Sequence, residues 1–275
     1  MLVEIENLSI AFPTPAGLAP AVRGLSLRIG PQKLGIVGES GSGKSLTARA
    51  ILRLLPPSAR VTADRLSFDG IDILRASERT MRGIRGRRAG LILQDAKYAL
   101  NPVMTAGQQI AEAWRAHARG TRREAAAKAL DLLEQVRIRD PARVARAYPH
   151  ELSGGMGQRV MIAMMLAPDP ELLIADEPTS ALDATVQAEI LRLLEDLVTH
   201  RGMSLILISH DLPLVSHFCD DVVVMYAGRI MERLPAADLA RASHPYTRGL
   251  LDCLPTLSLA KPRLPVMRRD PAWLT

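Results

Sequence analysis

The sequence predicts an α/β fold with a mainly parallel sheet and an inserted helical segment. From residue 172 the chain reads as strand, helix and strand, at residues 172–175, 184–198 and 204–208. This alternation is typical of parallel strands with helices covering the faces of the sheet. The first forty residues add short apolar strands separated by turns that contain Pro and Gly. Residues 103–170 read as mostly helical, which indicates a lobe inserted into the α/β core.

The N-terminal elements are expected strands at residues 2–5, 25–29 and 34–37, where apolar residues recur at strand spacing. Residues 12–20 contain three prolines and a glycine, so they predict a loop or a hairpin tip. Apolar residues at helical spacing over residues 45–55 predict a helix that Pro56 and Pro57 end.

Residues 61–93 return to short strands, and the helical segment follows. Its clearest helix is the Ala- and Leu-rich stretch at residues 123–136. We therefore expect one domain over residues 1–255, with a helical subdomain at about residues 95–170. The tail at residues 256–275 is rich in Pro and Arg and is predicted to be poorly ordered.

Composition excludes several classes of protein. Of the 275 residues, 48% are hydrophobic and 23% are charged, which are ordinary values for a globular protein and exclude wholesale disorder. The net charge of +6 is compatible with nucleic acid, anionic membrane or a phosphate-bearing ligand. Aromatic residues make up only 3%, and this argues against a single-strand nucleic-acid reader because such proteins need stacking rings.

Location and redox chemistry are also constrained. The uncharged apolar run that includes residues 161–167 is far shorter than the roughly 18 residues that span a bilayer. Glu4 and Glu6 stand where a signal peptide carries positive charge, so we expect a cytoplasmic protein. Two cysteines, Cys219 and Cys253, cannot build a disulfide framework or a four-cysteine metal site.

A phosphate-binding loop follows the expected strand at residues 34–37. It has the full pattern of glycines with a terminal Lys-Ser, and it precedes a helix. Its glycines let consecutive backbone N–H groups point into one concavity that a polyphosphate fills. Lys44 is expected to reach the outer phosphates, and the Ser45 hydroxyl is a candidate magnesium ligand. The loop residues are Gly38, Glu39, Ser40, Gly41, Ser42, Gly43, Lys44 and Ser45.

Two carboxylates end the apolar strand at residues 172–175. In a phosphate-loop protein, an acidic residue at such a position, here Asp176, holds magnesium through its water shell. The adjacent Glu177 can orient or deprotonate an attacking water. A plain buried strand running into a solvated acidic turn is the simpler interpretation, and the phosphate loop makes the functional one preferable.

Two further patterns carry a family resemblance. Leu152, Ser153, Gly154, Gly155 and Met156 are followed by Gln158 and Arg159, and Ser209, His210 and Asp211 follow the strand at residues 204–208. Ser-Gly-Gly at a helix start makes a second anion cradle. Together with the phosphate loop, these residues resemble the nucleotide-binding subunit of ABC transporters over residues 1 to about 255. The resemblance implies a P-loop NTPase core with a β-rich nucleotide-facing subdomain and an inserted helical subdomain.

The resemblance also assigns individual roles. It implies that Gln94 is the Q-loop glutamine, which touches magnesium or water, and that His210 contacts the γ-phosphate. Asp183, in Ser180-Ala181-Leu182-Asp183, belongs to the D-loop that crosses to a second subunit. Phe12 stands where an aromatic ring stacks on adenine, although a Phe in a strand can also be part of the core. ATP and Mg²⁺ are the implied ligands.

A finer resemblance is to the dipeptide, oligopeptide and nickel importer group. It rests on residues 100–102 (Leu-Asn-Pro), on residues 155–163 and on residues 244–247 (His-Pro-Tyr-Thr). It implies uptake of peptides, with nickel or metal chelates as the alternative. The implied partners are a second ATPase subunit of a different chain, two transmembrane permeases and an extracytoplasmic solute-binding protein, at the cytoplasmic face of the inner membrane.

The chain departs from the group's pattern at three places. Gly157 replaces the usual Arg or Gln, and residues 96–99 replace the usual Pro-x-x-Ser. The chain also lacks the Cys-containing tail of many peptide-importer subunits, and Cys253 alone cannot replace it. We therefore predict no iron–sulfur cluster.

Two alternatives have other expected features. A soluble ABC ATPase that acts on DNA or ribosomes would need a long coiled coil between the Q-loop and the signature, zinc cysteines or a second cassette, and would bind nucleic acid. An exporter subunit would differ by lacking a solute-binding partner. The sequence shows none of the soluble-protein features, so we expect no nucleic-acid partner.

Overall fold

The computed structural model describes residues 1–254 and 270–274, and it divides into two compact units. Unit 1 comprises Met1–Arg75 and Leu207–Thr275, and unit 2 comprises Ala76–Ile206. Unit 2 extends beyond the residues 95–170 expected for the helical subdomain, because the strands β7 (Ala89–Ile92) and β8 (Leu172–Asp176) group with its helices. Each unit is described by itself.

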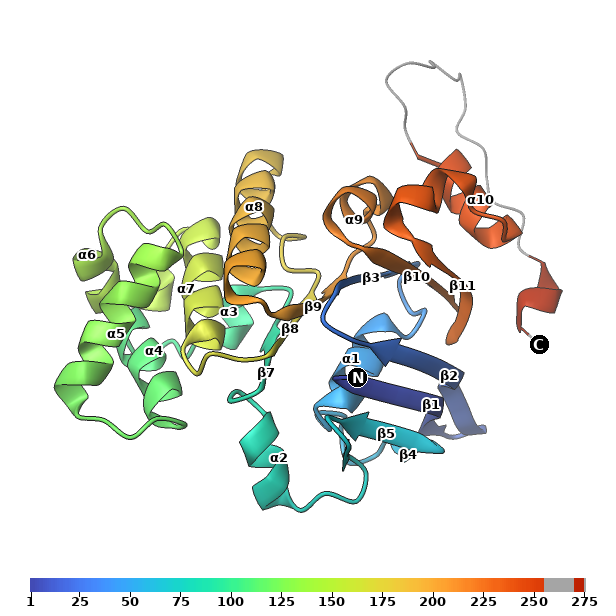
Figure 1. The fold of residues 1–275 in the computed structure, drawn as a ribbon, viewed down its shortest axis with the longest axis horizontal. Helices are drawn as coiled ribbons and strands as arrows, with labels where there is room; N and C mark the ends of the chain where they lie inside the picture. Colours follow the sequence, from blue (N-terminus) through green and yellow to red (C-terminus); the bar gives the residue numbers. More distant parts are fainter. Residues whose placement is uncertain (255–269, 275) are drawn as a thin grey trace. The chain divides into compact units, whose positions relative to one another are not determined.

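Unit 1 begins with an antiparallel sheet (Figure 1). Buried residues alternate with more exposed ones along much of its strands β1 and β2. Its strands lie in the order β2-β1-β5-β6, and β4 also pairs with β1. Val3, Ile5, Leu8 and Ile10 of the central strand are each at most 1% exposed, so this strand fixes the core-facing side. The strands are β1 (Val3–Thr14), β2 (Gly17–Ile29), β4 (Arg60–Thr62), β5 (Arg65–Phe68) and β6 (Ile71–Asp72).

Of the loop and the hairpin tip predicted for residues 12–20, the structure has the hairpin, with a shorter tip than expected. Phe12 pairs with Ala19, and pairing continues to Thr14 and Gly17, so the tip is only two residues long. Pro13 lies beyond the part of β1 that β4 pairs with, where one side of the strand needs no N–H donor. Prolines are therefore compatible with strand structure here.

A second group of strands in unit 1 carries the phosphate loop. β3 (Lys33–Gly38) runs parallel to β10 (Asp221–Tyr226), which pairs antiparallel with β11 (Arg229–Pro235). α9 packs tightly on β3, since a Cβ on Gly35 would lie 2.1 Å from Val215 Cγ1. The helices of this unit are α1 (Lys44–Ile51), α9 (Leu212–Phe218), η2 (Ala236–Arg241), α10 (Pro245–Asp252) and η3 (Pro271–Leu274).

Unit 2 contains parallel strands and the predicted helices. β7 (Ala89–Ile92) and β8 (Leu172–Asp176) pair in parallel, and β9 (Ser204–Ile208) starts beside β8, where the Ser204 N–H donates to Glu171 O at 2.9 Å. The helices begin at side-chain caps: Thr105 and Thr121 form capping boxes, and Ser153 caps α7. They are α2 (Glu78–Ile84), α3 (Ala96–Ala99), α4 (Ala106–Arg115), α5 (Arg122–Gln135), α6 (Pro141–Arg146), η1 (Pro149–Glu151), α7 (Gly154–Leu166) and α8 (Ala184–Arg201).

One helix prediction was wrong at its C-terminal end, and one helix was missed. α1 ends at Ile51, before Pro56, because Arg53 adopts a positive φ of 50° and the Leu54 N–H turns back to Arg49 O. α2 lies in the segment expected to hold only strands. Ser77 accepts a hydrogen bond from the Thr80 N–H, and this cap was the missed signal.

The C-terminal tail lies mostly outside the described residues, so the predicted disorder of residues 256–275 stays a prediction. In the described part, Trp273 of η3 packs against Tyr226 and Tyr246, with ring centroids 6.0 and 5.7 Å apart respectively. Across residues 1–254 and 270–274, no helix is both long and apolar enough to cross a membrane.

Candidate functional site

The predicted phosphate loop connects β3 to α1 in unit 1. Gly38 has a φ of 147°, and a Cβ there would lie 2.1 Å from Met225 O on the neighbouring β10. Gly43, the residue before α1, has a φ of 97°. Only glycine fits both positions without strain. The backbone can therefore turn sharply from the strand into the helix, as a phosphate cradle requires.

Lys44 lies inside the loop to which it belongs. Its side chain is only 5% exposed, and its Nζ donates to Gly38 O at 2.8 Å and to Glu39 O at 2.9 Å. Backbone carbonyls are weaker acceptors for an ammonium group than phosphate oxygens. The loop thus holds the buried ammonium group of Lys44, the group that the sequence analysis expects to reach the outer phosphates of a polyphosphate.

His210 and Phe12 also belong to unit 1. The Ser209 N–H donates to Ile36 O of β3 at 3.2 Å, so the exposed His210 follows at the carboxyl end of the strand that leads into the phosphate loop. Phe12 is half-buried on β1 instead of being fully in the core. A partly exposed ring remains available for stacking.

Tyr246 was missed as a site residue, although its His-Pro-Tyr-Thr motif was noted as a family marker. His244 caps α10, Pro245 is its first residue, and Tyr246 is completely buried. The Glu39 N–H donates a long hydrogen bond of 3.5 Å to the Tyr246 hydroxyl. The centroids of the Tyr246 and Tyr226 rings lie 4.7 Å apart. The tyrosine that contacts the phosphate loop at Glu39 is therefore itself packed against a second aromatic ring.

Three further predicted residues lie at one edge of the sheet in unit 2. β7 and β8 are parallel, with Ile92 paired to Ala175. Gln94 follows the end of β7, and Asp176 and Glu177 stand at the end of β8, so the three share the carboxyl edge of these strands. Asp176 is 5% exposed, and Glu177 has a positive φ of 48°, an uncommon conformation that turns the chain sharply after the strand.

The Ser-Gly-Gly segment and the Asp183 segment lie side by side in unit 2. Ser153 accepts a hydrogen bond from the Met156 N–H at 3.3 Å and caps α7, while Asp183 accepts from the Thr185 and Val186 N–H groups and caps α8. A Cβ on Gly155 would lie 2.7 Å from Val186 Cγ1. The two helix starts therefore pack closely, and Val186 is a contact that the sequence did not indicate.

Known proteins with this arrangement identify the family. Residues 22–180 match the family model described as ABC transporter. The chain belongs to the ABC transporter family. A probable peptide ABC transporter ATP-binding protein of Sinorhizobium fredii is 50% identical to this ABC ATPase over 93% of the chain and 77% of the relative. The dipeptide transport ATP-binding protein DppD of Bacillus subtilis is 45% identical over 94% of the chain and 78% of the relative.

Solved ABC cassettes share the fold. An ATP-binding cassette described as a dimer in a post-hydrolysis state with ADP and Pi is 26% identical, with a TM-score of 0.76 over 85% of this chain and 98% of that one. The predicted family and its P-loop NTPase fold are thereby confirmed. This ABC ATPase binds ATP and couples its hydrolysis to transport.

The residues present fit a magnesium ion that arrives with ATP. Among the described residues, no group of three or more His, Cys, Asp or Glu side chains could hold a metal. Mg²⁺ typically uses one or two protein oxygens together with substrate phosphates and waters. The Ser45 hydroxyl beside the phosphate loop and the buried Asp176 carboxylate supply oxygens of that kind.

Proposed function

We propose that this ABC ATPase powers peptide uptake as one of two cassettes that close on ATP. The observation that carries the catalytic part is the shared strand edge on which Gln94, Asp176 and Glu177 stand. The relatives named above carry peptide or dipeptide transport in their names, which favours peptides over nickel or metal chelates.

The proposal assigns a role toward ATP or magnesium to each predicted residue. Phe12 stacks on adenine, the phosphate-loop amides bind the phosphates, and Lys44 exchanges its loop carbonyls for phosphate oxygens. Ser45, Asp176 and Gln94 would hold Mg²⁺ directly or through water. When bound, Mg²⁺ neutralises the charge that the phosphates carry and develop.

Glu177 and His210 perform the hydrolytic step. Glu177 accepts a proton from the attacking water or orients it, and His210 holds the γ-phosphate in line. The Glu177 carbonyl accepts hydrogen bonds from the Ser180 N–H and hydroxyl, at 3.3 and 3.2 Å. The turn that positions the base thereby continues directly into the D-loop.

The second cassette completes each site. Ser153 and Gly154 are exposed at the start of the 13-residue helix α7, so they can cradle the γ-phosphate of nucleotide held by another chain. Asp183, exposed on the adjoining α8, lies beside them and would cross to the same partner. ATP bound between two chains stabilises the closed dimer, and hydrolysis of ATP ends this stabilisation.

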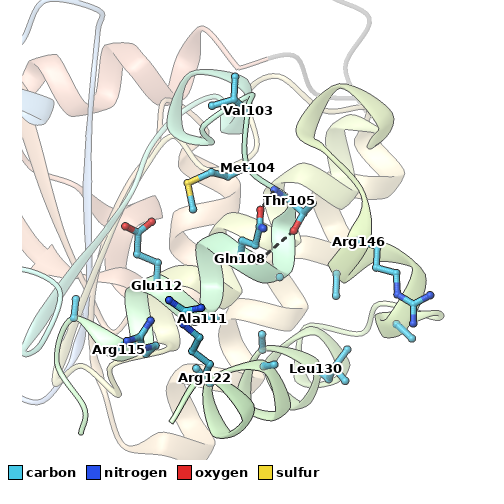
Figure 2. A pocket seen from close by; sticks show the side chains of 17 residues that line it. Val103, Met104, Thr105, Gln108, Ala111, Glu112, Arg115, Arg122, Leu130 and Arg146 are labelled. Carbon is cyan, nitrogen blue, oxygen red and sulfur yellow. Dashed lines mark hydrogen bonds between the residues drawn. The ribbon is translucent and has the colours of Figure 1, made fainter. Parts of the chain in front are cut away.

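A groove on the helices of unit 2 suits the permease partner. It has a volume of about 1090 Å³ and lies among α4, α5 and α6, and Met104 and several alanines are among its lining residues (Figure 2). Val103 at its rim is 78% exposed, and Tyr98 in the preceding α3 is 90% exposed. Because exposed large apolar residues beside a concave surface of mixed polarity mark interaction sites, we place a helical permease segment here.

The assembly then contains this chain, a second ATPase chain, two permeases and an extracytoplasmic solute-binding protein, with the ATPases at the cytoplasmic face of the membrane. The segment after Gln94 leads through α3 to the groove, which gives the permease a route to the magnesium-contacting glutamine. Closure of the cassettes would move the permeases through this contact.

Glu177→Gln in the assembled transporter tests the proposal. The amide keeps the shape of the side chain but cannot accept the proton, so ATP should still bind while turnover falls by about 10² or more. The Mg-ATP complex should remain closed. Glu134→Gln on the exposed face of α5 is the matched control. Turnover within twofold of the control would exclude Glu177 as the base.

A further inference from the structure

An arginine-lined pocket lies in unit 1 between the β1–β2 hairpin, β4 and the start of β11. Its volume is about 530 Å³, and three arginines, Arg23, Arg60 and Arg229, line it together with the hydroxyl-bearing Ser9 and Thr62. No Asp or Glu is among its lining residues, and neither Phe12 nor any phosphate-loop residue belongs to it. It is thus a basic cavity separate from the nucleotide-contacting residues of this unit.

The guanidinium groups in this pocket lack counterions. Within the described residues, no ion pair joins Arg23, Arg60 or Arg229 to a carboxylate, whereas the nearby Arg28 and Arg65 pair with Glu6 and Glu4. The Nε atoms of Arg23 and Arg229 are buried and have no hydrogen-bond partner. A buried polar atom without a partner is costly, and arginine cannot relieve the cost by losing its proton.

The backbone holds the arginines close together. The Arg23 N–H donates to Gly228 O at 2.8 Å, which ties β2 to the residue just before Arg229. A Cβ on Gly228 would lie 2.6 Å from Ala21 O, so the β10–β11 turn presses directly on β2. Arg60 pairs with Ala11 in the β1–β4 ladder, opposite the same hairpin. A site on paired strands keeps its geometry better than one on loops.

We propose that this pocket binds a small phosphate-bearing anion. Three planar guanidinium groups around one cavity match the several acceptor oxygens of a phosphoryl group, and the two hydroxyls add neutral donors. An anion would supply the partners that the two buried Nε atoms lack and would offset the repulsion among the three cations. The anion is free phosphate or the phosphate of a lipid headgroup.

The pocket adjoins the phosphate loop, so the experiment must distinguish anion binding in the pocket from anion binding at the phosphate loop. The Gly228 N–H donates to Ser42 O at 3.1 Å, and Val22, which lines the pocket, has its Cγ2 3.0 Å from the position of a Cβ on Gly43. Binding should therefore be measured with the phosphate loop filled by a non-hydrolysable ATP analogue and Mg²⁺.

Equilibrium dialysis of radiolabelled inorganic phosphate against the full chain tests the site. We expect saturable binding in the presence of the analogue. Arg60→Gln and Arg229→Gln should each weaken it by about tenfold or more, because each removes a charge-assisted hydrogen-bond donor. Arg75→Gln is the control, since it removes the same charge from a side chain that is 90% exposed in this unit. Arg60 is exposed on a short strand, so its variant should retain the wild-type melting temperature.

Flotation with phosphatidylcholine vesicles, with and without phosphatidic acid, separates the two sources of phosphate. Vesicle binding that needs phosphatidic acid and is lost in Arg60→Gln would assign the site to a lipid headgroup, and phosphate binding without vesicle binding would assign it to a soluble anion. Phosphate binding that disappears once the analogue fills the phosphate loop would overturn the proposal. Equal weakening by Arg75→Gln would overturn it as well, because general basic charge would then explain the binding.

Discussion

At the scale of single residues, Lys44 shows how the phosphate loop prepares for its ligand. The ammonium group is buried and satisfied by the loop's own oxygens, Gly38 O, Glu39 O and Ser42 Oγ. The loop therefore holds the cation in place, and in the proposed function this reduces the ordering that nucleotide binding must provide.

Lys44→Ala should weaken ATP binding by about tenfold or more, because a charge-assisted hydrogen bond to phosphate is lost. Isothermal titration of the isolated chain with ATP measures the change. Lys97→Ala, at an exposed position in unit 2, should leave the affinity unchanged. Equal affinities for the two variants would reject the assignment of Lys44.

Cys219 illustrates the opposite case, a titratable residue without a catalytic role. Burial against β3 raises the pKa of the Cys219 thiol from 9.0 to about 12, although Lys33 lowers it slightly. The reactive thiolate is therefore scarce at mildly alkaline pH. Iodoacetamide should label the half-buried Cys253 at least about tenfold faster than Cys219. Mass spectrometry gives the labelling rates of both cysteines. In urea-unfolded protein the two cysteines should be labelled at the same rate. Equal labelling rates in the native protein would show that the Cys219 thiol is accessible.

At the scale of elements, two of the three glycines in helix α7, Gly155 and Gly157, differ in what surrounds them. A Cβ on Gly157 would lie 3.5 Å from Ala96 Cβ, which is an ordinary contact, whereas a Cβ on Gly155 would lie 2.7 Å from Val186 Cγ1. Gly157 thus leaves room for the methyl group of an alanine, whereas the packing of α7 on α8 requires glycine at position 155.

Gly157→Ala should raise the free energy of unfolding by about 0.5–1 kcal/mol, because alanine loses less backbone entropy in a helix. Gly155→Ala should lower it by about 1 kcal/mol or more, since Val186 is β-branched and cannot rotate away freely. Urea-induced unfolding followed by circular dichroism compares the two. Stabilisation by both substitutions would show that α7 and α8 pack more loosely than described.

At the scale of the whole molecule, one chain presents both a phosphate loop and a Ser-Gly-Gly helix start. We place nucleotide between one chain's loop and the other chain's α7. Ser153→Arg adds bulk and positive charge at the exposed start of that helix. In the assembled transporter it should block closure over nucleotide held by the companion chain.

ATP binding to the isolated Ser153→Arg chain should equal that of wild type, because its own Lys44 site is untouched. Ser153→Ala is the control for the loss of the α7 cap, which costs about 1 kcal/mol of stability without adding bulk. Titration of the monomer and cross-linking of the assembled pair give the two readouts. Abolished ATP binding to the monomer would contradict the head-to-tail arrangement.

The sequence by itself determined the family and the α/β fold, and it predicted the phosphate-loop residues, because all three depend on short patterns with strict spacing. Loop glycines with positive φ, a Lys-Ser pair before a helix and two acidic residues after an apolar strand are local features. The length of the strands in the β1–β2 hairpin was underestimated because the prediction used local patterns alone. Prolines disfavour strands locally, and only the pairing with neighbouring strands shows where a strand tolerates them.

Only the tertiary structure decided which distant residues support the site. The Tyr246 hydroxyl meets the Glu39 N–H across 207 residues, and Val186 fills the space that Gly155 leaves open. Arg23, Arg60 and Arg229 share a pocket although they come from three different strands or strand ends. Such contacts depend on chain topology and on close packing in three dimensions, and no spacing along the sequence encodes them directly.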